Sequence, residues 1–252
     1  MVIIQVIGVE GIPIVKAGDN VGELICEAAK RQGTPIQSGD IVVVTHVVVS
    51  RAEGQVVNLD NVAPSEFAKN IAELYGKDPA LVEVVLRESK SIRRMDDGIL
   101  ITESKHGFTC ANSGVDKSNV PGERMVALLP ADPDASAERV KQEIKRVTGC
   151  DVAVIISDTH GRPFREGEIN VAIGVAGIKP IRDRRGEKDL FGYVLRVKQT
   201  AIADELASAA ELVIGQADEG VPVAIIRGYK FPQSNYAKAN ELIRSKEKDL
   251  FR

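Results

Sequence analysis

The apolar and polar positions alternate in blocks that predict a mixture of strands and helices. Runs rich in β-branched residues predict strands at 2–9, 41–49, 126–129, 152–156, 171–178 and 221–226. Amphipathic or capped segments predict helices at 20–31, 65–75, 78–89, 134–149, 200–214 and 236–251, with Asn20, Asp78 and either Asp134 or Ser136 as N-caps. A hairpin signal lies between 99 and 111. Because the two kinds of element alternate irregularly, the pattern favours an α+β fold with mixed or antiparallel sheets and flanking helices.

The chain shows no internal repeat and no linker, so we expect a single domain spanning 1–252 that could contain two interleaved subdomains. The segment 150–185 stands out in this order. Its apolar strand, 152–156, is followed at once by Asp158, Thr159 and His160. A polar turn after a buried strand is where α/β proteins often place their chemistry. The alternative is a polar turn that only joins two core strands.

Composition narrows the classes of function. The net charge is −3 and aromatic residues make up 4% of the chain, which argues against nucleic-acid binding through a basic surface or a stacking platform. No apolar run approaches the ~20 residues that span a bilayer, so we expect no membrane segment. The three cysteines, Cys26, Cys110 and Cys150, form no metal or disulfide motif and suggest the reducing cytoplasm.

The familiar nucleotide and protease motifs, such as the P-loop and HExxH, are absent. Three turns rich in oxygen donors remain, at 112–119, 157–160 and 215–219. If they converge, the carboxylate, hydroxyl and amide oxygens are suited to Mg²⁺ or Mn²⁺ and come from Asp116, Asp158, Thr159 and Gln216. The alternative is that these aspartates are Asx caps of ordinary turns.

Seven segments taken together resemble the coenzyme F420-0:L-glutamate ligase family, the F420 γ-glutamyl ligases. They occur in the same order over nearly the whole chain: GIPIVKAGD (11–19), GDIVVVTHVVVSRAEG (39–54), ANSGVDKSNV (111–120), LLPADPDASA (128–137), ISDTHGRPFREG (156–167), AIGVAGIKPIRD (172–183) and GQADEGVPVAIIRG (215–228).

The resemblance implies a GTP-dependent ligase with a γ-glutamyl-ligase-like fold that forms an intertwined homodimer. Its partners would be GTP, L-glutamate and coenzyme F420-0, and its cofactors two divalent cations, with K⁺ as a further candidate. By motif, Asp116 and Asp158 would bind one metal, and Thr159 and Gln216 the second. The implied nucleotide contacts are Gly11, Ile12, Pro13, Ile14, His46, Arg51, Asn119, Gly215, Gln216, Ala217, Asp218, Glu219, Gly220, Val221 and Pro222.

Ligation requires an activated carboxylate. GTP would phosphorylate that carboxylate to an acyl phosphate, which the glutamate amine would then attack. Asp116, Asp158, Arg162 and Arg165 are the predicted catalytic residues, the two arginines as bidentate ligands of a phosphodiester or a carboxylate. Surface ion pairing with Glu166 or Glu168 is the alternative for both arginines. Two other functions stay open at this point: a metal-dependent nucleotide phosphohydrolase and a binding module without catalysis.

Overall fold

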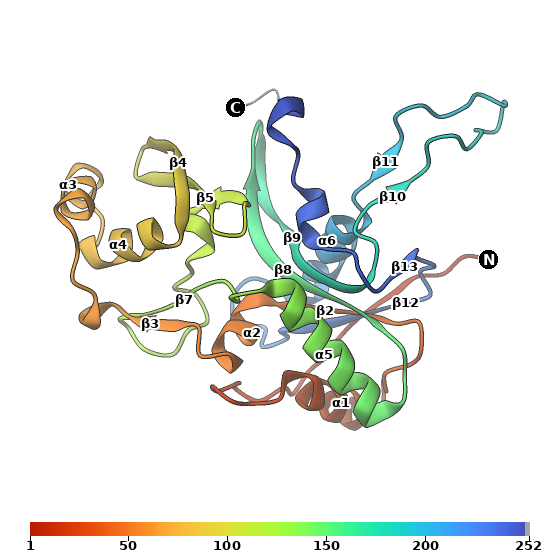
Figure 1. The fold of residues 1–252 in the computed structure, drawn as a ribbon. Helices are drawn as coiled ribbons and strands as arrows, with labels where there is room; N and C mark the ends of the chain where they lie inside the picture. The colour runs from red at the N-terminus through yellow and green to blue at the C-terminus, as the bar shows by residue number, and fades with distance from the viewer. Residues whose placement is uncertain (250–252) are drawn as a thin grey trace.

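A mixed six-stranded sheet forms the centre of the molecule (Figure 1). The structure is a computed structural model and describes residues 1–249. Across the sheet the strands follow the order β1 (Gln5–Gly8), β12 (Val223–Arg227), β2 (Ile41–Thr45), β8 (Ala153–Arg162), β9 (Arg165–Ile178) and β13 (Gln233–Ser234). Within the described residues β2 and β8 are the one parallel pair of this sheet, and its other neighbours are antiparallel.

Helices cover both faces of this sheet because its central strands are apolar on both sides. On β2, Val42 and Val44 pack toward one face, while Ile41 and Val43 pack toward the other. The helices over the first face are α1 (Val21–Gln32), α2 (His46–Ala52) and α5 (Pro133–Thr148), and α6 (Ile202–Ile214) covers the second. In Figure 1 α1 and α5 lie on the opposite side of the sheet from α6.

A smaller lobe with its own apolar core lies beside the sheet, at the left of Figure 1. It contains α3 (Glu66–Tyr75), α4 (Pro79–Arg87) and a three-stranded sheet of β4 (Ser89–Asp96), β5 (Ile99–Ser104) and β6 (Thr109–Ala111). The chain enters and leaves this lobe through the antiparallel pair β3 (Val56–Asn58) and β7 (Met125–Ala127). The short 3₁₀ helices η1 (Leu59–Asn61) and η2 (Asn112–Gly114) complete it.

An extended arm leaves the body after β9. The strands β10 (Arg182–Asp183) and β11 (Gln199–Thr200) pair at its base, and residues 184–198 project away from the sheet in Figure 1. Its exposed apolar side chains are Leu190, Phe191, Tyr193, Val194 and Val197. The described chain ends with two short 3₁₀ helices, η3 (Ala239–Leu242) and η4 (Lys246–Lys248).

The pairing pattern brings distant segments together at one end of the central strands. Thr45, the last residue of β2, pairs with Ser157 of the parallel strand β8 at this end. The strand β12 runs antiparallel to β2, so it begins at the same end with Val223 opposite Val44. Because β1 is antiparallel to β12, β1 ends there too. The segments after β1, after β2 and before β12 therefore meet beside the middle of β8.

Most predicted elements are confirmed, including the α+β class with mixed sheets. The N-cap Asn20 accepts a hydrogen bond from the Glu23 N–H at 3.1 Å, and Ser65 and Asp78 cap α3 and α4 in the same way. For α5, however, the prediction that Asp134 or Ser136 forms the cap is wrong. The cap is Asp132, whose carboxylate accepts from the Ala135 N–H at 3.0 Å.

Three predicted elements are wrong. The strand expected over 41–49 ends at Thr45, and α2 begins at His46, because burial of Val47–Val49 against the sheet outweighs their β propensity. The polar turn expected after 156 is instead a continuation of β8 to Arg162. The helix expected over 236–251 is replaced by η3 and η4, since this charged segment buries little apart from Ala239. Its last two residues lie outside the described part.

A β-bulge shapes the sheet where β8 turns polar. Ile156 pairs with Gly174, but Ser157 pairs with Ala172, so Ile173 is the extra residue on β9. The Ala172 N–H that the bulge frees donates to the Asp204 carboxylate of α6 at 2.9 Å. This change of register, held by a side chain of α6, sets which residues of β9 stand opposite Asp158 and Thr159.

Candidate active site

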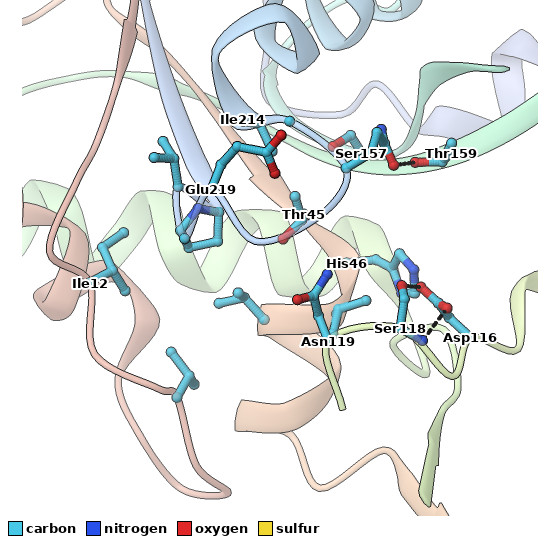
Figure 2. A pocket seen from close by; sticks show the side chains of 18 of the residues that line it. Ile12, Thr45, His46, Asp116, Ser118, Asn119, Ser157, Thr159, Ile214 and Glu219 are labelled. Carbon is cyan, nitrogen blue, oxygen red and sulfur yellow. Dashed lines mark hydrogen bonds between the residues drawn. The ribbon is translucent and has the colours of Figure 1, made fainter. Parts of the chain in front are cut away.

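A cavity of about 240 Å³ lies at the end of the central strands where these segments meet (Figure 2). Its lining comes from both lobes and from almost the full length of the chain. The lining residues are Ile12, Pro13, Ile14, Val15, Thr45, His46, Val47, Val48, Arg51, Asp116, Ser118, Asn119, Ser157, Asp158, Thr159, Asn170, Ile214, Gly215, Gln216, Ala217, Glu219, Gly220, Val221 and Pro222.

Most of the site residues predicted from the sequence line this one cavity. Among the predicted nucleotide contacts, Gly11 and Asp218 are not lining residues, although their chain neighbours are. The predicted catalytic residues Arg162 and Arg165 lie at the far end of the β8–β9 hairpin and do not line it either. The Arg162 guanidinium donates to the carbonyl of Glu166 at 3.0 Å rather than to an acidic side chain. Any part they take in substrate binding stays a prediction.

Asp158 is the most enclosed acidic group of the cavity, with 8% of its surface exposed. Its Oδ1 accepts from the Thr159 N–H at 2.8 Å and lies 3.2 Å from the His46 Nε2. Its Oδ2 lies 2.9 Å from the His160 Nε2. Burial raises the pKa of Asp158, but the neighbouring His46 and His160 outweigh it and hold that pKa well below its usual range. The carboxylate is therefore ionised at neutral pH.

His160 is the counterpart of this carboxylate. Burial lowers the pKa of His160, but the hydrogen bonds to Asp158 and Cys110 outweigh it and raise the pKa well above its ordinary value. The His160 imidazole is therefore protonated at neutral pH, and Asp158 forms an ion pair with it at the wall of the cavity. The negative charge of Asp158 is therefore compensated by His160 before any ligand binds.

Asp116 reaches the cavity from the smaller lobe. Its backbone pairs with Ala127, with the Asp116 N–H donating to the Ala127 carbonyl at 3.0 Å. Its two carboxylate oxygens accept from the backbone N–H and the hydroxyl of Ser118, at 2.7 and 2.8 Å, in an Asx-type turn (Figure 2). Each oxygen keeps a further lone pair, so this turn orients the carboxylate without using up its capacity to bind a cation.

Thr159 and Gln216 meet although 57 positions separate them. The Thr159 Oγ1 lies 3.2 Å from the Gln216 Oε1. Both side chains also bond to Asn170 on β9, whose Oδ1 accepts from the Thr159 hydroxyl at 2.8 Å and from the Gln216 Nε2 at 3.1 Å. Asn170 stands directly opposite Thr159 in the β8–β9 ladder. Two of the predicted ligand residues are thus brought together by a third polar residue.

Arg51, in the last turn of α2, ties the two lobes together at the cavity. Its Nε donates to the Val15 carbonyl at 3.0 Å and its Nη1 to the Asn119 carbonyl at 3.3 Å. Its Nη2 is buried and has no hydrogen-bond partner. Burial lowers the pKa of Arg51, which records the cost of removing the guanidinium from water. A buried cationic donor without a partner at a cavity is suited to receive an anion.

Several lining residues were not predicted from the sequence, among them Thr45, Ser157, Asn170 and Ser118. Thr45 and Ser157 could have been found, because each is the first hydroxyl after an apolar run of a strand. Asn170 could not, because its place opposite Thr159 depends on the register of the β8–β9 hairpin and on the bulge at Ile173.

Cation binding here would rest on a mixed set of oxygens. Within residues 1–249 no three His, Cys, Asp or Glu side chains are grouped as a metal cluster. The cavity instead offers the carboxylates of Asp116 and Asp158 and the neutral oxygens of Thr159 and Gln216. Neighbouring ligands of an octahedral Mg²⁺ with bonds of about 2.0–2.1 Å lie about 3 Å apart. The 3.2 Å between the Thr159 and Gln216 oxygens fits that spacing.

Sequence comparison identifies relatives over the full length of the chain. The profile of the F420-0:Gamma-glutamyl ligase family matches residues 11–228. The coenzyme F420:L-glutamate ligase of Methanothermobacter thermautotrophicus is 50% identical over 250 residues, which cover 99% of each chain. Those of Methanocaldococcus jannaschii and Methanopyrus kandleri are 49% and 48% identical, covering 99% and 97% of this chain and 97% of each relative. The chain therefore belongs to the F420-0:Gamma-glutamyl ligase family.

Proposed function

We propose that this chain is a GTP-dependent ligase that joins L-glutamate to coenzyme F420-0 and then extends the product through a γ-glutamyl linkage. The observation that carries the proposal is the convergence of the shared motifs. Segments from five separated parts of the chain, which carry the resemblance to the ligases, line one cavity that combines carboxylates, neutral oxygens and a half-buried arginine.

The walls of the cavity are suited to a nucleoside triphosphate. The unpartnered Nη2 of Arg51 offers a charge-assisted bond to a phosphate oxygen. The turn after β1 and the segment before β12 add apolar surface for a base, from Ile12, Ile14 and Val221. Gly215 has φ 74 and ψ −177, a conformation open to glycine alone, and it starts the loop that supplies Gln216.

Asp116 and Asp158 would hold one divalent cation, and Thr159 and Gln216 a second. In protein sites Mg²⁺ commonly binds one or two carboxylates, and water and phosphate oxygens complete its coordination. When bound, these Mg²⁺ or Mn²⁺ ions, with K⁺ as a further candidate, neutralise the charge of the transferring phosphate. Asp158 is prepared for this role because its carboxylate is already ionised.

In the proposed reaction, a carboxylate oxygen of the coenzyme precursor attacks the γ-phosphorus of GTP, so that the bond to GDP breaks and an acyl phosphate forms. The glutamate amine then attacks the acyl carbon, loses a proton, and expels inorganic phosphate to leave an amide. Arg51 would bind the phosphates during both steps. Arg162 and Arg165 are retained as candidates for binding a carboxylate or phosphodiester of an incoming substrate.

We further propose that the chain acts as a homodimer in the cytoplasm. The arm 184–198 exposes Leu190 and Phe191 almost completely, at 97% and 96% of their surfaces, and such apolar groups are suited to a second copy. The three cysteines are free, which suits a reducing compartment. Within the described residues no helix has the length and apolarity to cross a bilayer.

The test is mass spectrometry of coenzyme F420-0 after incubation with the purified chain, GTP, Mg²⁺ or Mn²⁺, and L-glutamate. We expect the mass to rise by one or more glutamyl units, with one GDP and one phosphate released for each. Parallel reactions lacking glutamate separate ligation from nucleotide hydrolysis. Reactions with ATP in place of GTP test the nucleotide requirement. GTP cleavage that is independent of glutamate, without any mass change, would refute the ligase.

A further inference from the structure

Asn170 holds an unusual position at the cavity. It is a polar side chain with 2% of its surface exposed, and it lies between β8 and the loop that follows α6. Its Oδ1 is the common acceptor for a hydroxyl and an amide that come from segments far apart in the chain. Its own backbone carbonyl accepts from the Ser208 hydroxyl of α6 at 2.8 Å, which fixes the residue relative to that helix.

The number of hydrogens available decides what this contact does. The Thr159 hydroxyl has one hydrogen and two acceptors within reach, the Asn170 Oδ1 at 2.8 Å and the Gln216 Oε1 at 3.2 Å. The shorter contact to Asn170 takes the hydrogen. The Gln216 Nε2 donates to the same Oδ1 at 3.1 Å, so the carbonyl end of that amide must face Thr159.

Two acceptor oxygens, the Thr159 Oγ1 and the Gln216 Oε1, are left facing each other at 3.2 Å without a hydrogen between them. Their lone pairs repel, and a cation beside both oxygens would relieve that repulsion. Without the Asn170 acceptor, the Thr159 hydroxyl could donate to Gln216 instead. The two side chains would then satisfy each other and present no pair of free oxygens.

We infer that Asn170 is a positioning residue that makes Thr159 and Gln216 into a pair of cation ligands. The inference rests on the proposed function, since it concerns the second of the two proposed metal sites. Asn170 acts by taking the Thr159 hydrogen and by fixing the orientation of the Gln216 amide, while its own side chain stays behind the two ligands. Residues that orient metal ligands in this way commonly change metal affinity 10–100-fold when mutated.

The test is titration of the full-length protein with Mn²⁺, followed by calorimetry and by the signal of free Mn²⁺ in electron paramagnetic resonance. It is made with and without a non-hydrolysable GTP analogue. Asn170→Ala should weaken Mn²⁺ binding at one site by about 10-fold or more. In the ligation assay its half-maximal Mn²⁺ concentration should rise by a similar factor, while the rate at saturating Mn²⁺ largely recovers.

Asn170→Asp is the conservative variant, because a carboxylate of nearly the same shape can accept both hydrogens. It should bind Mn²⁺ at least as tightly as the wild type. The matched control is Ser208→Ala, which removes the bond to the Asn170 backbone and leaves the Oδ1 contacts in place. This control should lower the melting temperature slightly and keep Mn²⁺ affinity within about twofold.

Unchanged Mn²⁺ affinity in Asn170→Ala would overturn the inference and leave the ligase proposal standing. A loss of 10-fold or more in Asn170→Asp would also overturn it, and this variant decides the matter if Asn170→Ala does not fold. A wild-type chain that ligates glutamate but binds a single Mn²⁺ would refute the second site and this role of Asn170 together. Absence of ligation with intact Mn²⁺ binding would count against the proposed function alone.

Discussion

At the scale of single residues, several polar groups of the cavity take partners from distant parts of the sequence. Asp158 is ionised because His46 and His160 lie beside it, and Arg51 is anchored by carbonyls from two other segments. Asp158, His46 and Arg51 were among the site residues predicted from the sequence, and all three line the cavity. It could not predict that the pKa of His160 is raised, because that depends on Asp158 and Cys110 meeting it in the folded chain.

Asp116→Asn and Asp158→Asn should both reduce ligation by about 100-fold or more, because each removes a charge proposed to bind a cation at the transferring phosphate. Their stabilities should differ. Asp158→Asn leaves the largely buried His160 imidazolium without its carboxylate and should cost about 2 kcal/mol. Asp116 lies nearer the surface, and an asparagine there still accepts from Ser118. Paired urea unfolding and turnover measurements check this, and near wild-type turnover in both variants would remove the metal assignment.

Arg51→Ala should raise the KM for GTP by about 10-fold or more, because a charge-assisted bond to phosphate contributes roughly 1.5–3 kcal/mol. Arg51→Lys keeps the charge but loses the fork that reaches Val15 and Asn119. It should therefore keep much of the GTP binding while weakening the contact between the segments of Val15 and Asn119. Initial rates over a GTP series separate the variants. Equal KM values for the alanine variant and the wild type would place the phosphates elsewhere.

At the scale of elements, the sequence was informative where local signals decide and misleading where packing decides. The caps Asn20 and Asp78 were correctly identified because a capping bond is local. The change from strand to helix at His46 was missed, since three valines in a row favour a strand unless a face of the sheet buries them. The continuation of β8 through Asp158 was missed for a related reason: its partner β9 supplies the pairing.

The stability of the protein should depend on pH through Asp204, whose carboxylate accepts the N–H freed by the bulge in β9. Burial raises the pKa of Asp204 despite its bond from the Ala172 N–H, so the ionised form is disfavoured in the folded state. A raised carboxyl pKa destabilises the protein at neutral pH, and that cost falls as the pH drops toward the unfolded value of about 3.9. Asp204→Asn should therefore match or exceed wild-type stability at pH 7, and its advantage should shrink toward pH 4.

Asp204→Ala is the matched variant, because it leaves the Ala172 N–H without an acceptor and should cost about 1–2 kcal/mol, with the larger cost at the lower pH. Denaturant unfolding of the three proteins at pH 7 and pH 4.5 provides the comparison. An Asp204→Asn advantage that grows on acidification would contradict the assigned direction of the pKa shift.

At the scale of the whole molecule, the exposed arm predicts assembly. Light scattering should give a mass of about twice 27.2 kDa at micromolar concentration. The double variant Leu190→Glu with Phe191→Glu places two charges in an apolar contact and should shift the protein to the monomer. Leu74→Glu, an exposed position on α3 in the other lobe, is the control and should leave the mass unchanged. A monomeric wild type would refute the homodimer.

The order of strands in the central sheet also bears on how the chain folds during synthesis. β12 lies between β1 and β2, although β1 and β2 are made first and β12 near the end. The nascent chain must keep these two apolar strands from pairing with each other until Val223–Arg227 has left the ribosome. Such long-range closure slows folding and leaves strand edges open to aggregation. We therefore expect the smaller lobe to form its core early, while the sheet, and with it the cavity, is completed only after synthesis of β12.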